Sequence, residues 1–137
     1  MMGPVWIDER GSEVLEPSEC HRLLALAAKQ GRVAHLGIAQ DGAPLVVPVD
    51  FTVHGPDPLV RIGEGLFDRI GSRGMVALEV DDPDADPPWS VLVRGETVLE
   101  EAAAGGSGAP VPRVAEAGHR IVRIRADQVT GRRLGTG

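Results

Sequence analysis

The sequence is poor in cysteine, aromatic residues and lysine, and each shortage excludes a class of protein. Cys20 is the only cysteine among 137 residues, so no disulfide can form within the chain, and a reducing cytoplasm is the expected compartment. Aromatic residues make up 3% of the chain, too few for a platform on which single-stranded nucleic acids stack. Lys29 is the only lysine and the net charge is −6. Nucleic acid is therefore not an expected partner, because backbone binding needs clustered positive charge.

Long apolar segments are absent as well. No run approaches the roughly 20 apolar residues that a membrane-spanning helix needs. The opening residues, MMGPVWIDERG, lack the basic region and apolar stretch of a signal peptide. No membrane partner is expected. With 42% hydrophobic and 25% charged residues, residues 1–137 are predicted to form one globular domain.

The clearest feature that is present is a helix, predicted over residues 17–31. Ser18 is the predicted N-cap, and Gly31 suits the position just beyond the last turn. Apolar residues recur at helical spacing along it, and they are Cys20, Leu23, Leu24 and Ala27. Cys20 is therefore interpreted as a small core residue and not as a nucleophile.

After Gly31 the apolar residues alternate, which predicts strands. Residues 32–39 and 45–53 form a predicted β-hairpin, in which Pro48 indicates a sheet edge or a bulge. Four further strands are predicted, at 59–62, 75–81, 89–100 and 119–125.

Smaller signals complete the prediction of the fold. Gly95 indicates a bulge within its strand. Residues 64–74 are predicted to contain a short helix, and residues 101–112, rich in Gly and Ala, a mobile loop. Six short strands with one capped helix predict a mainly β fold, an antiparallel barrel or a sandwich.

Familiar catalytic and metal-binding motifs are not found. The four histidines, which are His21, His35, His54 and His119, occur in no spacing typical of a metal site. No serine lies in a GxSxG elbow. Cys20 and His21 are adjacent on a helix, where neighbours point about 100° apart, so they form no dyad. No metal is expected, and no catalytic residue is assigned.

One segment, VRIGEGLFDRI at residues 60–70, combines an arginine with a glycine-rich turn. Such a turn can hold a phosphate, but the segment lacks the lysine of a P-loop and the third glycine of a dinucleotide-binding motif. From these residues alone, the favoured interpretation is a strand-ending turn with Arg61 pointing into solvent.

Four segments taken together resemble the pyridoxamine 5′-phosphate oxidase-like family of FMN-binding split barrels, and within it the short bacterial stress-associated flavoproteins. They span residues 18–53, 59–70, 76–100 and 120–133. Their motifs are the GR before the first strand, PVDF, EVD, WSVLVRG and the closing IRADQVTGRR. Each motif is weak by itself, and their joint occurrence in the family's order is specific.

The resemblance implies a six-stranded antiparallel split β-barrel with an N-terminal helix and short connecting helices. It also implies a homodimer with flavin sites at the subunit interface. In such proteins the PV strand gives backbone contacts to the flavin ring, and the Trp-Ser pair reaches toward it. The implied cofactor-binding residues are Pro48, Val49, Arg61, Ile62, Gly63, Gly65, Phe67, Trp89 and Ser90.

The chain departs from the family at the phosphate turn, which usually reads Arg-Thr-x-x-Gly-x-Lys. It matches at Arg61 and Gly65 but has Ile62 for the threonine and Phe67 for the lysine. One charge-assisted hydrogen bond is worth roughly 1.5–3 kcal/mol, so the missing lysine predicts FMN binding weakened about tenfold to a hundredfold.

Three functions are consistent with the sequence. The first is an FMN- or deazaflavin-dependent oxidoreductase that acts on an unidentified small molecule. The second is a non-catalytic barrel that holds a small ligand or haem. The third is a dimeric structural module with an empty site. Pyridoxamine phosphate is not favoured as the substrate, because the C-terminal elements of the true oxidases are not found.

Overall fold

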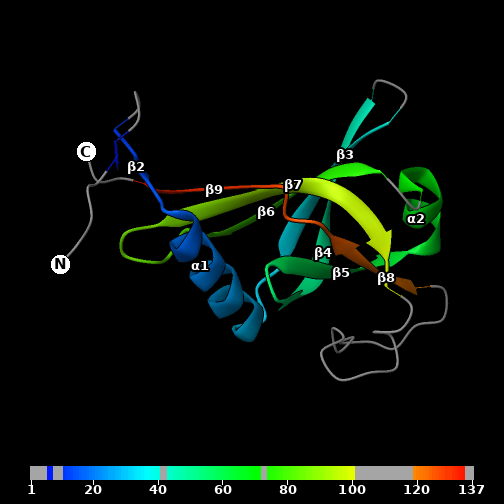
Figure 1. Cartoon of the computed structure of the whole chain (residues 1–137), viewed down its shortest axis with the longest axis horizontal. Coiled ribbons are helices and arrows are strands. Elements are labelled where there is room, and N and C mark those ends of the chain that lie inside the picture. Colours follow the sequence, from blue (N-terminus) through cyan, green and yellow to red (C-terminus); the bar gives the residue numbers. More distant parts are fainter. Residues whose placement is uncertain (1–5, 8–10, 41–42, 72–73, 101–118, 135–137) are drawn as a thin grey trace.

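Six antiparallel strands close into a barrel in the computed structural model, which describes residues 6–7, 11–40, 43–71, 74–100 and 119–134 (Figure 1). The barrel strands are β3 (Ala34–Gln40), β4 (Ala43–His54), β5 (Asp57–Gly63), β6 (Met75–Asp82), β7 (Trp89–Leu99) and β8 (His119–Ile124). They pair in the order β7-β6-β3-β4-β5-β8, and β8 returns to β7. These are the six strands that the sequence predicts, so the mainly β barrel is confirmed.

Three further strands extend the sheet beyond β7. They are β9 (Gln128–Arg133), β2 (Glu13–Val14) and β1 (Trp6–Ile7), added in that order. Strand β9 was not predicted from the sequence, because its residues QVTGRR contain one large apolar side chain and no alternating apolar pattern. Residues 101–112, predicted as a mobile loop, lie outside the described residues.

The predicted helix is present as α1 (Pro17–Lys29), and its apolar stripe is buried as expected. Ser18 is not its N-cap. Glu16 holds that position, because Pro17 fits the first helical turn, where its missing N–H has no partner to lose. Gly31 is confirmed beyond the last turn, with φ of +69°, and the N–H of Arg32 donates to the carbonyl of Ala27 over 3.0 Å.

Helix α1 packs against the part of the sheet formed by β4, β6, β7 and β9 (Figure 1). Its Cys20 is fully buried, and Sγ of Cys20 would lie 2.7 Å from a Cβ placed on Gly131 of β9. The absence of a side chain at Gly131 therefore lets the helix approach the sheet. The same junction is tied by Arg133, whose guanidinium donates to Glu13 over 2.8 Å and to Glu19 over 2.5 Å.

Gly95 of β7 is not a bulge. Its pairing with Val76 continues the regular register between β6 and β7 without an extra residue. A Cβ on Gly95 would lie 1.5 Å from the carbonyl oxygen of Arg125. Along one edge of β7, residues 89–94 pair with β9 and residues 97–99 pair with β8. Gly95 lies between these two stretches, where the backbone that follows β8 passes close to β7, so glycine is needed there.

Strand β4 divides its pairing between two neighbours. Residues 43–49 pair with β3, and residues 50–54 pair with β5. Among the described strands, none pairs with the second edge of residues 43–49. Pro48 lies in this half, so the predicted sheet edge is confirmed. The paired strands of the β3–β4 hairpin project from the rest of the barrel in Figure 1.

Where the barrel closes at β8, the side chain of Arg123 contacts three residues. Arg123 donates to Glu100 over 2.7 Å and to Asp57 over 3.3 Å, and it contacts Nδ1 of His54 at 2.9 Å. The β4–β5 turn is thereby joined to the ends of β7 and β8.

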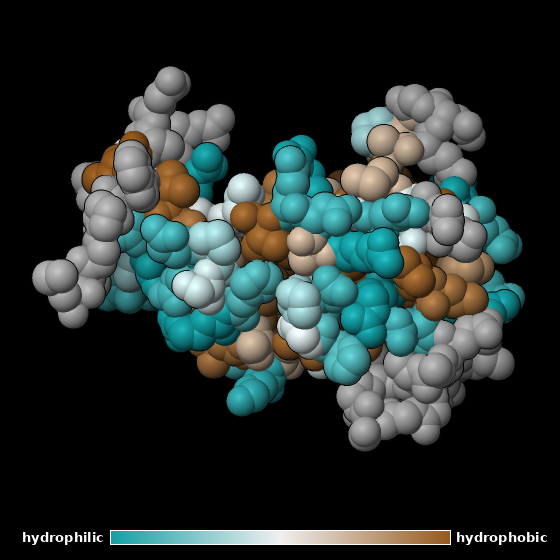
Figure 2. Space-filling model, in the orientation of Figure 1, coloured by the Kyte–Doolittle hydropathy of each residue, from teal (hydrophilic) through white to brown (hydrophobic). Residues whose placement is uncertain are grey.

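No helix among the described residues is long and apolar enough to cross a membrane. Hydrophilic residues cover much of the face in Figure 2, with apolar patches between them.

Candidate functional site

A pocket of about 230 Å³ opens where β4 passes from β3 to β5. Strand β4 supplies consecutive residues to its wall, β5 supplies its last residues, and α2 (Glu64–Ile70) and the start of β8 complete it. The lining residues are Val47, Pro48, Val49, Asp50, Arg61, Ile62, Gly63, Leu66 and His119. The pocket thus borders the unpaired edge of β4.

An ion pair occupies the wall of this pocket. Nη2 of Arg61 donates to Oδ2 of Asp50 over 2.8 Å. The two residues stand directly opposite each other in the β4–β5 ladder, and their side chains are 12% and 25% exposed, respectively. Arg61 therefore does not point into solvent, as the turn alone had suggested. Its positive charge is matched by a carboxylate in the same pocket.

The structure brings five of the nine predicted cofactor-binding residues into this one pocket. They are Pro48, Val49, Arg61, Ile62 and Gly63. Ile62 is 2% exposed and also belongs to the barrel core. These five come from β4 and β5, which pair antiparallel in the structure, so their proximity follows from that pairing.

Gly65 and Phe67 are near the pocket in sequence but do not line it. Both lie on α2, and Leu66 is the residue of that helix that reaches the pocket. The ring of Phe67 packs against the core and lies 5.4 Å from the guanidinium of Arg120. Phe67 thus holds a cation–π contact where the resembling family has a lysine.

Trp89 and Ser90 begin β7 and do not line the pocket either. The side chain of Trp89 is 3% exposed and belongs to the core. Ser90 shares the outer face of the sheet with Leu92 of the same strand. On the same face, the residue opposite Leu92 on β6 is Glu79, the residue opposite Glu79 on β3 is His35, and the residue opposite His35 on β4 is Pro48.

The family follows from comparison with known proteins. A family model described as pyridoxamine 5′-phosphate oxidase matches residues 16–133. The chain belongs to the pyridoxamine 5′-phosphate oxidase family. No curated protein sequence matches significantly.

Solved structures extend this result. The FAD binding protein from Mycobacterium smegmatis is 30% identical, with a TM-score of 0.72, and the match covers 89% of this chain and 99% of that one. A FAD-binding protein from Mesorhizobium loti is 22% identical over 90% and 99% of the two chains, with a TM-score of 0.66. The heme binding protein from M. smegmatis is 15% identical over 84% and 54%, with a TM-score of 0.61. The last two show the fold alone.

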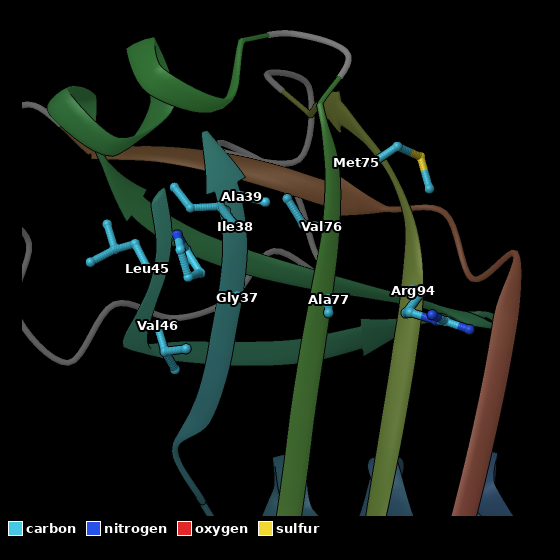
Figure 3. Close-up of a pocket in the computed structure, with 10 residues that line it drawn as sticks. Gly37, Ile38, Ala39, Leu45, Val46, Met75, Val76, Ala77 and Arg94 are labelled. Carbon is cyan, nitrogen blue, oxygen red and sulfur yellow. The ribbon is translucent and has the colours of Figure 1, made fainter. Parts of the chain in front are cut away.

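A second, apolar pocket of about 360 Å³ lies on the sheet formed by β4, β3, β6 and β7 (Figure 3). Ten residues line it, namely Gly37, Ile38, Ala39, Pro44, Leu45, Val46, Met75, Val76, Ala77 and Arg94. Val46 and Met75 are 66% and 65% exposed, which is unusual for large apolar side chains. This member of the pyridoxamine 5′-phosphate oxidase family therefore presents an apolar surface beside the unpaired edge of β4.

The outer face of β3 and β6 carries a group of ionisable side chains. Nδ1 of His35 lies 3.4 Å from Oε1 of Glu79. Burial of Glu79, followed by its hydrogen bond to Asp81, raises the pKa of Glu79 to about 7. Among the described residues, no three His, Cys, Asp or Glu side chains are placed to hold a metal ion.

Sequence reasoning missed Asp50, His119 and Leu66 as pocket residues. The signal for Asp50 was wrong by one residue, because the predicted strands end at residue 53 and resume at residue 59, which places Phe51 opposite Arg61. In the structure His54 pairs with Asp57, so Asp50 stands opposite Arg61. His119 offered no such signal, since β8 is separated from β5 by most of the chain's second half. The position of Leu66 depends on which face of α2 packs against the barrel, and the glycines of this segment obscured that helical pattern in the sequence.

Proposed function

We propose that this chain binds a flavin, or a related deazaflavin, and uses it to oxidise or reduce a small molecule. The proposal is carried by one observation. Five residues that the family resemblance implies in cofactor binding line a single pocket beside the unpaired edge of β4. FMN is the flavin that the resemblance names, and FAD is the one named for two similar structures.

The unpaired edge of β4 suits the polar edge of a flavin ring. In residues 43–49, every second residue directs its backbone N–H and C=O away from β3. A flavin ring carries carbonyl acceptors and an N–H donor along one edge, which complement such an array. Pro48 offers only a carbonyl, because proline has no backbone N–H. The ribityl arm would then extend toward Arg61.

A bound flavin supplies the hydride chemistry, while this chain's residues bind and orient the ring and exclude water. Val47, Val49 and Ile62 provide apolar contacts along the pocket wall. No side chain is assigned as a general acid or base. This arrangement requires none when the reaction consists of hydride transfer between two bound molecules.

A second copy of the chain is part of this proposal. The pocket holds about 230 Å³, which is below the usual 300–1,000 Å³ of a ligand site. The neighbouring apolar pocket and the exposed Val46 and Met75 offer a surface that a partner subunit can cover. Pairing through that surface would enclose the ring.

Haem is the second candidate ligand. Imidazole is a common axial ligand of haem iron, and His119 lines the pocket. A similar fold is described for a heme binding protein. The absorption spectrum of the purified protein separates the two, since a flavin gives its visible bands and haem gives a Soret band.

The pocket itself is tested by filling it. Gly63 lines the pocket, and no atom lies within 4 Å of where a Cβ on it would stand, so Gly63→Leu adds a side chain at the pocket wall whose Cβ meets no atom. We expect at least about tenfold weaker riboflavin binding, measured by fluorescence quenching. Gly65→Leu is the matched control, because Gly65 is equally open but does not line the pocket. Equal losses in both variants, or none in Gly63→Leu, would contradict the proposed site.

A further inference from the structure

The charges around Arg61 do not favour the binding of a phosphate group. Arg61 donates to Asp50 at 2.8 Å, and the pair is 12% and 25% exposed. The two residues are fixed opposite each other by the β4–β5 register. Both side chains line the pocket, and the other lining residues include no second arginine and no lysine. The formal charges of the pair therefore cancel at the place where a phosphate would approach.

A terminal phosphate would meet a carboxylate at this place. At pH 7 a phosphate monoester carries about −1.5 to −2 charges. To reach Arg61 it must displace Asp50 or lie within a few ångströms of it, where like charges repel and low solvent exposure weakens screening. The hydroxyl group of riboflavin meets no such repulsion. FAD carries one charge on each of the two phosphates of its diphosphate, so the single phosphate nearest Asp50 carries less charge than the terminal phosphate of FMN, and the penalty is smaller. The family's threonine and lysine, which would offset the repulsion, are absent here as Ile62 and Phe67.

We propose that Asp50 determines which flavin this pocket accepts. By neutralising Arg61, it selects flavins that lack a dianionic terminal phosphate, which are riboflavin and FAD, over FMN. This inference rests on the flavin-binding proposal above. It assigns a specificity role to a residue that lies within the PVDF segment but is not among the cofactor-binding residues that the resemblance implies.

The test compares three flavins on the wild-type protein and on Asp50→Asn. Asparagine keeps the shape of the side chain and an oxygen that can accept from Arg61, but it removes the charge. We expect wild-type protein to bind FMN no more tightly than riboflavin or FAD, by isothermal titration. In Asp50→Asn, FMN binding should strengthen by about tenfold to a hundredfold relative to riboflavin, the range for one charge-assisted hydrogen bond. Comparing riboflavin with FAD identifies which of the two permitted flavins is preferred.

Two variants control for indirect effects. Asp127→Asn makes the same charge change at an exposed residue that does not line the pocket, and it should leave the FMN-to-riboflavin ratio unchanged. Asp50→Asn combined with Arg61→Gln should lose the gain in FMN affinity, because the gain depends on the released guanidinium. If Asp50→Asn does not fold, Asp50→Ser replaces it, since its hydroxyl can still accept from Arg61.

The outcomes separate this inference from the flavin proposal. Wild-type preference for FMN over riboflavin by tenfold or more would overturn the role of Asp50, and so would an unchanged ratio in Asp50→Asn. If no flavin binds either protein, the flavin proposal fails. Inorganic phosphate then decides the role of Asp50, through the Arg61 Nε–H signal in NMR titrations. A shift in Asp50→Asn but not in wild type supports the inference, and the same response in both proteins overturns it.

Discussion

The carboxyl group of Glu79 lies on the outer face of β6, between His35 of β3 and Asp81 on its own strand. Burial is the first reason why its pKa rises from the ordinary value of 4.5 to about 7, and the hydrogen bond to Asp81 is the second. The neighbouring carboxyl group of Asp81 makes the charged form of Glu79 less favourable. Glu79 therefore changes charge near neutral pH, although a surface glutamate would not.

We predict that Glu79→Gln changes how stability depends on pH. Because the pKa of Glu79 is raised in the folded protein, its contribution to stability is fully present below about pH 4.5 and is lost as the pH rises through about 7. The glutamine variant should therefore melt at a higher temperature than wild type at pH 8, while the two should differ little at pH 5. Melting curves followed by circular dichroism across this range measure the difference. A constant offset at every pH would mean that the carboxyl group does not titrate as described.

At this scale, the sequence identified part of the site. Arg61, Pro48 and Val49 could be chosen from local motifs, because each lies in a short pattern that the family repeats. Asp50 and His119 could not be chosen that way, because their importance comes from what stands across the sheet. A local motif can identify a single residue of the pocket. The pairing of two charged side chains across a sheet depends instead on the register between two strands, which a local motif does not contain.

At the scale of elements, β7 depends on a single missing side chain. Gly95 leaves room for the carbonyl of Arg125, 1.5 Å from where a Cβ would stand. We predict that Gly95→Ala destabilises the protein by about 2–4 kcal/mol, because backbone atoms must move to relieve the clash. Urea denaturation measures this change.

Gly65→Ala provides the opposite expectation with the same substitution. Gly65 lies within α2, where no atom comes within 4 Å of the position that an added Cβ would take. Alanine should therefore stabilise the protein by about 0.5–1 kcal/mol, since glycine is the poorer helix former. If the two alanine variants lost similar stability, the close approach at Gly95 would not explain its requirement for glycine.

The junction of α1 with β9 gives a second prediction for an element. Hydrogen bonding to Arg22, and then to Arg133, lowers the pKa of Glu19 from 4.5 to about 2 in spite of partial burial. Its contribution is therefore present above pH 4.5 and is lost as the pH falls toward 2. Glu19→Gln should reduce stability at pH 7 by up to about 1 kcal/mol, a value limited by solvent screening, and the loss should vanish near pH 2. Chemical denaturation at both pH values tests this, with the exposed Glu16→Gln as control.

The elements themselves were predictable wherever an apolar period was present. All six barrel strands and α1 carry such a period, and all were predicted. Strand β9 was missed because it joins the sheet through backbone pairing with β7 and not through an apolar face. The first residue of α1 was predicted correctly, but its N-cap is Glu16 and not Ser18, because Pro17 in the first turn outweighs the capping preference of Ser18.

For the whole molecule, the proposed homodimer makes a direct prediction. Val46 is 66% exposed on the unpaired half of β4 and lines the apolar pocket. If a partner subunit covers this surface, Val46→Glu should weaken the dimer by about a hundredfold or more, because a buried carboxylate without a partner is strongly unfavourable. Light scattering after size exclusion, at several concentrations, measures the shift toward monomer.

Val33→Glu is the matched control for that experiment. Val33 is 41% exposed, precedes β3 and does not line the apolar pocket. It should leave the dimer intact. A wild-type protein that is already monomeric at micromolar concentration would remove the basis for an interface site, and dissociation in both variants would place the interface elsewhere.

The way in which the barrel closes also determines when it can form during synthesis. The contact between Arg123 of β8 and Asp57 of β5 joins residues that are 66 positions apart, whereas the β3–β4 hairpin joins near neighbours. Folding slows as such distant contacts dominate, into the range of about milliseconds to seconds for all-β domains. Of the six barrel strands, β8 is the last to leave the ribosome. The nascent chain can therefore form its hairpins while translation continues, but β5 and β7 must wait with exposed edges until β8 emerges, and a chaperone that shields strand edges would act in that interval.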